Sequence, residues 1–290
     1  MTEVKTEINI AIIGAGIGGI ALAIGLCRQN IPYTLYEAAP AFSMVGAGVG
    51  LGPNAQRAMD LIEPKLKALY DGISTGNVTP GKSHVIFDAR LSTDGFGEDQ
   101  GWGQSIGSEN YERTSAHRKD LLDIMTSLIP IKTVKFSKKV ETIEEIDRKV
   151  KVKFVDGEEI EVDTVIGCDG SYHGASRPAV LREEYPEHIA ATYAGKYCYR
   201  SIVPMKDATE ILGSLAGDAQ MFLGKGRNVL AYPISRGSEL NVIAFIMDEK
   251  PWDNSAWVKE VSKEEMVADW KGHVDERLVK LLDVGYLHRS

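Results

Sequence analysis

Three glycines and one acid near the start of the chain are the first residues that could do chemistry. Gly14, Gly16 and Gly19 have the G-x-G-x-x-G spacing, and Glu37 follows at about the distance expected for a ribose-binding acid. In this pattern the first glycine permits a tight turn, the second lets a pyrophosphate approach the backbone, and the third lets a helix pack closely. An acid at Glu37 repels a 2′-phosphate, so the pattern predicts a site for FAD or NAD rather than NADP.

Elements of the right type surround these residues. Residues 8–13 are apolar and largely β-branched, which predicts a buried parallel strand. A helix should run from about residue 20 to 30 and end before Pro32, and residues 33–36 should form a second strand. The glycine pattern alone is weak evidence, but strand, turn, helix, strand and acid in register are specific. A glycine-rich turn without a ligand remains the alternative.

Length and composition limit the possible classes of protein. A chain of 290 residues, 43% of them hydrophobic, is long enough for two lobes. The net charge of −8 and the dispersed basic residues argue against nucleic acid or an acidic membrane as a partner. Three cysteines without C-x-x-C spacing fit a reducing compartment and indicate no metal site. Without an apolar run of membrane-spanning length, we expect a soluble, cytoplasmic protein.

Three further candidates follow along the chain. Gly50 lies in a run of alternating glycines whose backbone can lie flat against a large ligand, or simply connect a strand to a helix. Arg118 begins a predicted helix and by itself is most simply a solvated base. Asp169 ends a short apolar strand, where open α/β sheets bind ligands, although Asp-Gly is also a common turn.

The second half of the chain changes pattern. Apolar runs at 193–203, 220–223, 228–234 and 239–247 predict an antiparallel meander that forms one wall of a substrate pocket. We therefore expect a dinucleotide-binding domain, for FAD or NAD, over 1–177 with inserted strands around 78–112, and a β-sheet substrate domain over 178–250. Residues 251–290 should form a shortened helical segment that returns toward the first lobe.

Taken in order, these motifs resemble the FAD-dependent aromatic monooxygenases of the salicylate hydroxylase type, including fungal enzymes that hydroxylate phenolic polyketides. The resemblance extends from about residue 8 to residue 282. It implies an α/β fold with a Rossmann-like FAD-binding lobe and a mostly antiparallel substrate lobe. Members of this family continue further, through a third flavin motif and closing helices.

The resemblance also implies roles for named residues. FAD would be held by Gly14, Gly16, Gly19, Glu37, Gly50, Arg118 and Asp169. Arg200 and Tyr232 would orient a phenolic or aromatic-acid substrate, because a buried arginine stays charged and a tyrosine hydroxyl can fix a ring. A surface salt bridge for Arg200 and core packing for Tyr232 remain open. NAD(P)H would be the cosubstrate and O₂ the oxidant.

Two other functions stay open at this point. A shortened, catalytically weak relative would keep the nucleotide-binding fold without holding FAD firmly. An NAD-dependent dehydrogenase would also fit the glycine motif taken alone. The sequence does not identify the aromatic substrate, the choice between NADH and NADPH, or the oligomeric state.

Overall fold

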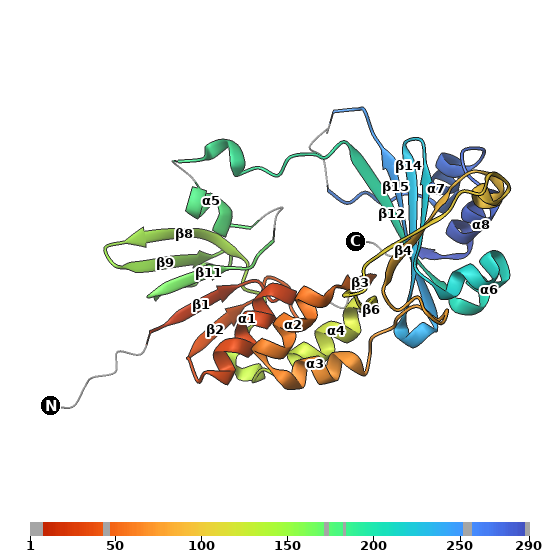
Figure 1. Ribbon diagram of the computed structural model, residues 1–290. Helices are drawn as coiled ribbons and strands as arrows, with labels where there is room; N and C mark the ends of the chain where they lie inside the picture. Colours follow the sequence, from red (N-terminus) through yellow and green to blue (C-terminus); the bar gives the residue numbers. More distant parts are fainter. Residues whose placement is uncertain (1–7, 43–46, 171–173, 182–183, 252–256, 288–290) are drawn as a thin grey trace. The chain divides into compact units, whose positions relative to one another are not determined.

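The computed structural model describes residues 8–42, 47–170, 174–181, 184–251 and 257–287. The chain forms two compact units, which are described separately (Figure 1). Unit 1 comprises residues 1–44, 59–68 and 122–192, and unit 2 comprises residues 45–58, 69–121 and 193–290. Three helices belong partly to each unit: α2 (Pro53–Ile62), α3 (Pro64–Asp71) and α4 (Arg118–Thr126).

A four-stranded parallel sheet in the order β11-β1-β2-β7 forms the centre of unit 1. The strand, turn, helix and strand predicted for the start of the chain are confirmed. β1 is buried throughout, as its run of aliphatic residues predicts. The elements are β1 (Ile10–Ile13), α1 (Ile17–Arg28), β2 (Tyr33–Tyr36), β7 (Val134–Lys135) and β11 (Thr164–Gly167).

A three-stranded antiparallel sheet completes unit 1. It consists of β8 (Val140–Ile146), β9 (Lys149–Phe154) and β10 (Glu159–Val162), and it precedes the short helix α5 (Ser176–Leu181). The hairpin predicted for residues 150–162 is confirmed. Val152 and Phe154 are fully buried, while lysines of β9 form ion pairs with glutamates of β8 and β10. This alternation gives the sheet one apolar face and one wet face.

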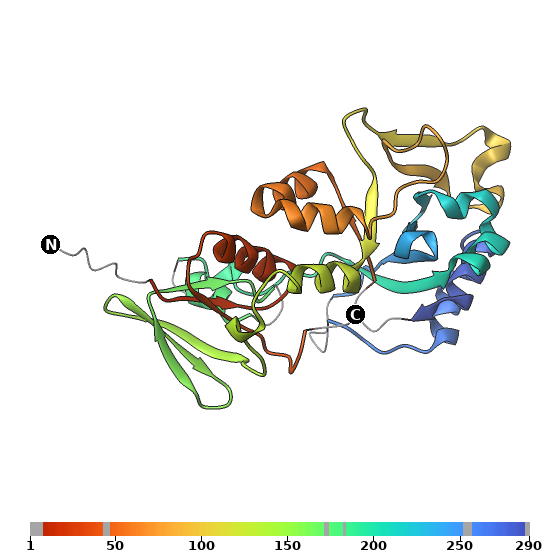
Figure 2. The same ribbon diagram turned by 90° about the horizontal axis from the view of Figure 1, so that it is seen from below.

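Unit 2 is built on a seven-stranded sheet in the order β16-β12-β15-β14-β13-β4-β5. Every neighbouring pair is antiparallel except β13 and β4, so the mostly antiparallel lobe expected from the sequence is confirmed. Figure 2 shows the same sheet from below. Its strands are β4 (Val85–Leu91), β5 (Gln104–Gly107), β12 (Lys196–Pro204), β13 (Gln220–Gly224), β14 (Arg227–Ile234), β15 (Glu239–Met247) and β16 (Tyr286–Leu287).

The two faces of this sheet differ. Helices α6 (Met205–Leu212), α7 (Lys263–Trp270) and α8 (Glu276–Val284) pack on the helix-covered face, whose core includes Phe222, Val242 and Trp270 (Figure 1). The opposite face carries a smaller cluster of Ile202, Ala219, Tyr232 and Ile234. We call it the ribbon face, because the ribbon of β3 (Gly48–Leu51) and β6 (Thr114–His117) contacts it.

The chain divides differently from the predicted domains. Residues 45–58 and 69–121 belong to unit 2 rather than to a domain over 1–177, because β4 pairs with β13 and β3 pairs with β6. The helices of the segment 251–290 add Met266, Trp270 and Leu278 to the core of unit 2. Helix α6 was not predicted. Short 3₁₀ helices occupy Asp94–Gln100, Ile131–Thr133, Pro186–His188, Gly213–Gly217 and Ser235–Gly237.

Candidate functional site

Two of the three motif glycines are required by the backbone of unit 1 itself. Gly14 has a φ of 101°, and its N–H donates to the Tyr36 carbonyl at 2.7 Å. A Cβ on Gly14 would lie 2.5 Å from the Cys168 carbonyl oxygen, and one on Gly19 would lie 1.9 Å from the Gly14 carbonyl oxygen. Since these neighbours are backbone atoms that cannot move aside, any side chain at either position would displace the strand or the helix.

Gly16 differs from the other two. Its backbone is extended, and no atom lies within 4 Å of the position that a Cβ would take. It is the N-cap of α1, where no side chain accepts from the first backbone N–H groups and the first turn holds no acid. Free N–H groups at the start of a helix favour an anion such as a phosphate. The space over Gly16 therefore suits a ligand rather than the packing of the protein.

Glu37 directs its carboxylate at this turn. One oxygen accepts from the Ala15 N–H at 2.7 Å and the other from the Ala39 N–H at 2.8 Å. These two hydrogen bonds fix the side chain beside the glycines. Because each carboxylate oxygen has a second lone pair, Glu37 can still accept from a ribose hydroxyl in this position.

Asp169 also lies next to the glycine turn, although its carboxylate accepts a hydrogen bond from the loop and helix that follow it in the chain. The Cys168 N–H donates to the Ile13 carbonyl, which sets the end of β11 beside the turn. One carboxylate oxygen of Asp169 accepts from the Ser176 N–H at 3.0 Å, at the start of α5. Unit 1 thus brings together Glu37, Asp169 and the motif glycines, while the side chain of Asp169 shapes the loop that follows it.

Gly50 and Arg118, the other two predicted cofactor residues, lie on the β3–β6 ribbon of unit 2. Gly50 pairs with Ser115, and Arg118 follows β6 directly as the first residue of α4. The Arg118 N–H donates to the Ala47 carbonyl at 3.1 Å. The ribbon therefore brings both residues into one local element. Gly46, which begins the predicted glycine-rich loop, lies outside the described residues.

The predicted substrate pair lies on the ribbon face. Tyr232 is 6% exposed, and its hydroxyl donates to the Gly48 carbonyl at 3.1 Å, so toward a ligand it can only accept. Burial raises the pKa of Tyr232, and the positive charges of Arg113 and Arg200 oppose this shift. Arg200 is partly buried and pairs with Ile243 on β15. By strand alternation Arg200 and Tyr232 project from the same face.

Arg113 is a residue that sequence reasoning missed. It lies just before β6, is 4% exposed, and places its guanidinium carbon 4.9 Å from the Tyr232 ring centre and 5.7 Å from that of Phe87. Burial lowers the pKa of Arg113, against the weaker opposing effect of neighbouring tyrosines. Its position in a polar stretch gave no sign of burial. The strand that follows it, Thr114–His117, is not apolar either, so the sequence offered no signal for the burial of Arg113.

The Gly217-Asp218-Ala219 segment connects the 3₁₀ helix Gly213–Gly217 to β13. The Asp218 carboxylate accepts from the N–H groups of Val78 and Thr79 and pairs with Lys82. These bonds tie residues 78–82 to the start of β13. The Asp218 carboxylate is therefore used in hydrogen bonds and an ion pair within unit 2.

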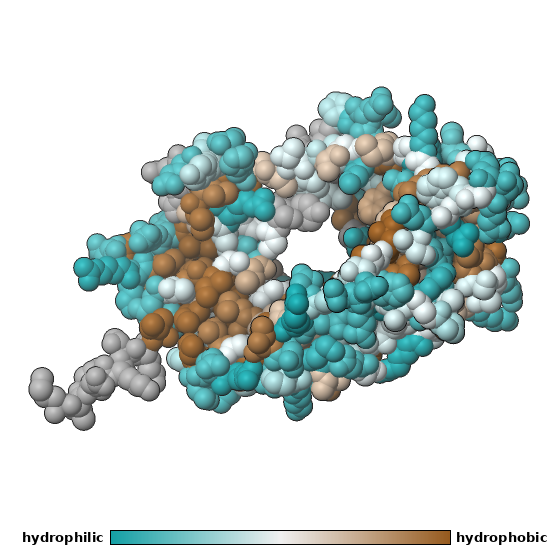
Figure 3. Space-filling model, in the orientation of Figure 1, coloured by the Kyte–Doolittle hydropathy of each residue, from teal (hydrophilic) through white to brown (hydrophobic). Residues whose placement is uncertain are grey.

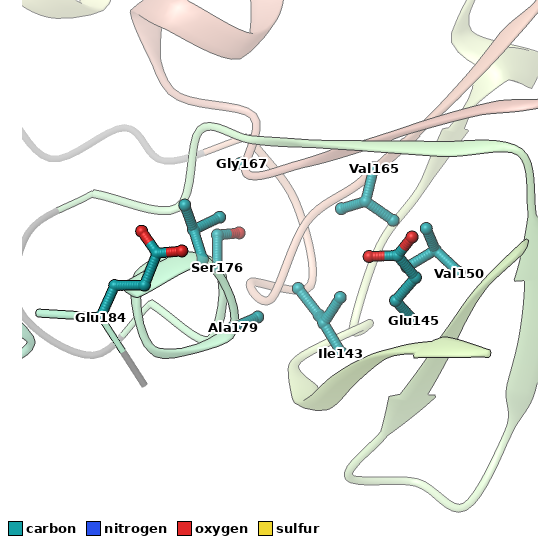
Figure 4. A pocket seen from close by; sticks show the side chains of 9 residues that line it. Ile143, Glu145, Val150, Val165, Gly167, Ser176, Ala179 and Glu184 are labelled. Carbon is teal, nitrogen blue, oxygen red and sulfur yellow. The ribbon is translucent and has the colours of Figure 1, made fainter. Parts of the chain in front are cut away.

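A cavity of about 460 Å³ lies in unit 1, between α5 and strands of its two sheets (Figure 4). Its lining is mixed, with aliphatic side chains such as Ile143 and Val165 beside the polar side chains of Glu145, Ser176 and Glu184. Figure 3 shows apolar surface gathered on this unit. Among the described residues, the lining includes none of the predicted site residues and no aromatic ring, so we do not assign the cavity to the candidate site.

The described residues contain no group of three or more His, Cys, Asp or Glu side chains placed to hold a metal ion. They also contain no helix that is long and apolar enough to cross a membrane.

The geometry defines a class of protein before any comparison is made. In unit 1, a parallel sheet, a glycine turn open at Gly16 and an acid fixed beside it form a dinucleotide-binding fold. In unit 2, a mostly antiparallel sheet presents an arginine and a tyrosine on one face.

Comparison with known proteins assigns the family. The chain is 40% identical to a FAD-dependent monooxygenase of Gibberella moniliformis, over 97% of this chain and 66% of the relative. It is 35% identical to a 6-methylsalicylate 1-monooxygenase of Aspergillus terreus, over 96% of this chain and 63% of the relative. A solved salicylate hydroxylase substrate complex superposes with a TM-score of 0.77 at 25% identity, covering 98% of this chain and 67% of that one. No family model matches the chain.

The chain belongs to the FAD-dependent aromatic monooxygenases of the salicylate hydroxylase type, as its motifs predicted. It spans about two thirds of the length of the relatives that it matches.

Proposed function

We propose that this chain binds FAD and takes part in the hydroxylation of a phenolic or aromatic-acid substrate with NAD(P)H and O₂. The observation that carries the proposal is the glycine turn: open at Gly16, closed at Gly14 and Gly19, with the carboxylate of Glu37 hydrogen-bonded to Ala15. Membership of the family supports FAD as the dinucleotide, and it favours a monooxygenase over a dehydrogenase.

The residues present fit the cofactor. The pyrophosphate of FAD would lie over Gly16 at the start of α1, and Glu37 would accept from a ribose hydroxyl. Gly50 and Arg118 would contact the cofactor from the β3–β6 ribbon, where a guanidinium suits phosphate. When bound, the flavin supplies the electron transfer and oxygen chemistry. Arg200 and Tyr232 would hold the aromatic ring, and the apolar cluster around Tyr232 would exclude water.

A pair of glycine variants tests cofactor binding. Gly16→Ala adds a methyl group to open space, so the fold should keep its melting temperature while FAD affinity falls at least about tenfold because the pyrophosphate loses its close approach. Gly18→Ala is the matched control, since its added methyl group also meets no atom within 4 Å and no ligand contact is assigned there. Flavin fluorescence titration measures both affinities.

The outcomes separate the alternatives. Wild-type protein that folds but binds no FAD favours a shortened relative without the family's activity. Equal loss of FAD affinity in Gly16→Ala and Gly18→Ala contradicts the assignment of the pyrophosphate to Gly16. Alcohol-dependent reduction of NAD⁺ without a need for oxygen would establish the dehydrogenase instead.

A further inference from the structure

Arg113 is a buried charge for which the described residues of the fold provide no counter-ion. Its side chain is nine-tenths or more buried, and its Nε has no hydrogen-bond partner among those residues. The titratable groups that act on it are Tyr232, Tyr111 and Tyr70, and none of them is an acid. The guanidinium lies over the rings of Tyr232 and Phe87.

The surrounding rings do not balance this charge. Contact with aromatic faces offsets part of the loss of hydration of a guanidinium, but it does not replace an anion. Burial raises the pKa of Tyr232, so that hydroxyl stays neutral near pH 7, and its proton is donated to the Gly48 carbonyl. Among the described residues, no negative charge faces this guanidinium.

We propose that Arg113 binds the ionised group of an aromatic ligand, a carboxylate or a phenolate, on the ribbon face beside Tyr232. The inference rests on the proposed function and adds to it a second arginine, besides Arg200, as a specificity-determining residue. Phe87 and Tyr232 offer ring surface to the aromatic part. The Tyr232 oxygen, which can only accept, suits a ligand hydroxyl beside the charged group. These features favour a hydroxylated aromatic acid over a neutral aromatic compound.

Calorimetric titration of the full chain with salicylate and with its neutral analogue salicylamide tests this inference. Wild-type protein should bind salicylate at least about tenfold more tightly. Arg113→Met, which keeps much of the side-chain length without the charge, should bind the two ligands about equally. Arg90→Met is the matched control, because Arg90 is an arginine of unit 2 on strand β4, but it is paired with Gln220 and Glu98. That variant should keep the preference for salicylate.

Thermal unfolding separates a binding role from a structural one. Removal of an unpaired buried charge should leave the melting temperature of Arg113→Met equal to or above that of the wild type. A clearly lower melting temperature overturns the proposal, since Arg113 would then serve the fold. The proposal is also overturned if the wild type binds both ligands equally, binds neither at millimolar concentration, or keeps its preference in Arg113→Met.

Flavin titration of the same samples keeps the two proposals apart. If the wild type discriminates salicylate through Arg113 but takes up no FAD, the proposed function fails and this inference stands. If FAD binds and Arg113→Met leaves ligand preference unchanged, this inference alone fails.

Discussion

Two arginines of unit 2 lie over aromatic rings in different surroundings. The Arg277 guanidinium carbon is 3.8 Å from the Phe96 ring centre, and the side chain pairs with both carboxylate oxygens of Asp275 at 2.9 and 2.8 Å. Arg113 lies over Tyr232 and Phe87, but no acid within the described ranges pairs with it. The charge of Arg277 thus has its counter-ion, Asp275, within the fold. An unpaired buried charge points instead to a ligand.

The same difference separates the two faces of the seven-stranded sheet. Side chains of α6, α7 and α8 fill the helix-covered face with aliphatic and aromatic groups. The ribbon face has a smaller apolar cluster, and beside it lie the Arg113 Nε and the Asn241 Nδ2, both buried and without a hydrogen-bond partner among the described residues. Buried polar groups are normally paired in native proteins. The core of the helix-covered face also contains a buried group without a partner in the described part of the chain, the Trp270 Nε1, but that group is neutral. The ribbon face is where an unpaired charge is buried, and we therefore expect a ligand there.

The largest effect expected from this comparison is on stability, at the paired arginine. Asp275 accepts from the Gly95 N–H, caps α8 through the Arg277 N–H, and pairs with the Arg277 side chain. Asp275→Asn removes the charge from all these bonds and should lower the free energy of unfolding by about 2 kcal/mol. Urea denaturation measures the change. Asp283→Asn, at an exposed residue paired with Lys263 at 3.6 Å, should change it by less than about 0.5 kcal/mol.

The pH dependence of this effect has a definite sign. Burial by itself raises the pKa of Asp275, but hydrogen bonds from Arg277 and Gly95 outweigh it, so the pKa lies below its ordinary value. A depressed pKa stabilises the folded state above the unfolded-state value of about 3.9, and the contribution is lost as pH falls through the folded-state value. The stability difference between wild type and Asp275→Asn should thus be full at pH 6 and shrink below about pH 4. A difference that stayed constant to pH 3 would contradict this account.

The smallest effect is expected on the ribbon face. Tyr232→Phe leaves the partly buried Gly48 carbonyl without its donor and should lower the free energy of unfolding by about 1 kcal/mol. If the hydroxyl also accepts from a ligand, the variant should lose the preference for salicylate over benzoate but keep the preference for salicylate over salicylamide, which depends on Arg113. Calorimetry with the three ligands measures this. Loss of both preferences would show that the two residues do not act on separate groups of the ligand.

Much of the cofactor region was predictable because its geometry is local in sequence. The positive φ of Gly14 and the close contact of Gly19 arise within one strand-turn-helix unit. Such a unit can be recognised in the sequence, because glycine is present where no side chain fits and an acid is present at the end of the next strand. The direction of Glu37 toward the turn followed the same pattern. Binding of FAD by these residues remains a prediction.

The division of the chain was less predictable. Residues 78–112 were expected as strands inserted in the first domain, yet β4 lies parallel to β13 in the sheet of unit 2. Strand pairing between segments so distant in sequence depends on the register of the whole sheet, which short alternating runs do not specify. For the same reason the sequence did not predict that α7 and α8 would complete the core of unit 2.

The sequence by itself determined the glycine turn, the acid beside it, the alternation of the meander and the family. Only the tertiary structure decided which charges lack partners. Arg113 and Arg277 are the same residue type, and both lie at the start of a regular element. Arg113 directly precedes β6, and Arg277 is the second residue of α8. One meets Asp275 two residues earlier in the chain, while the other is buried against a strand that begins more than a hundred residues later. Burial and the absence of a counter-ion depend on contacts between distant segments, and such contacts leave no local pattern.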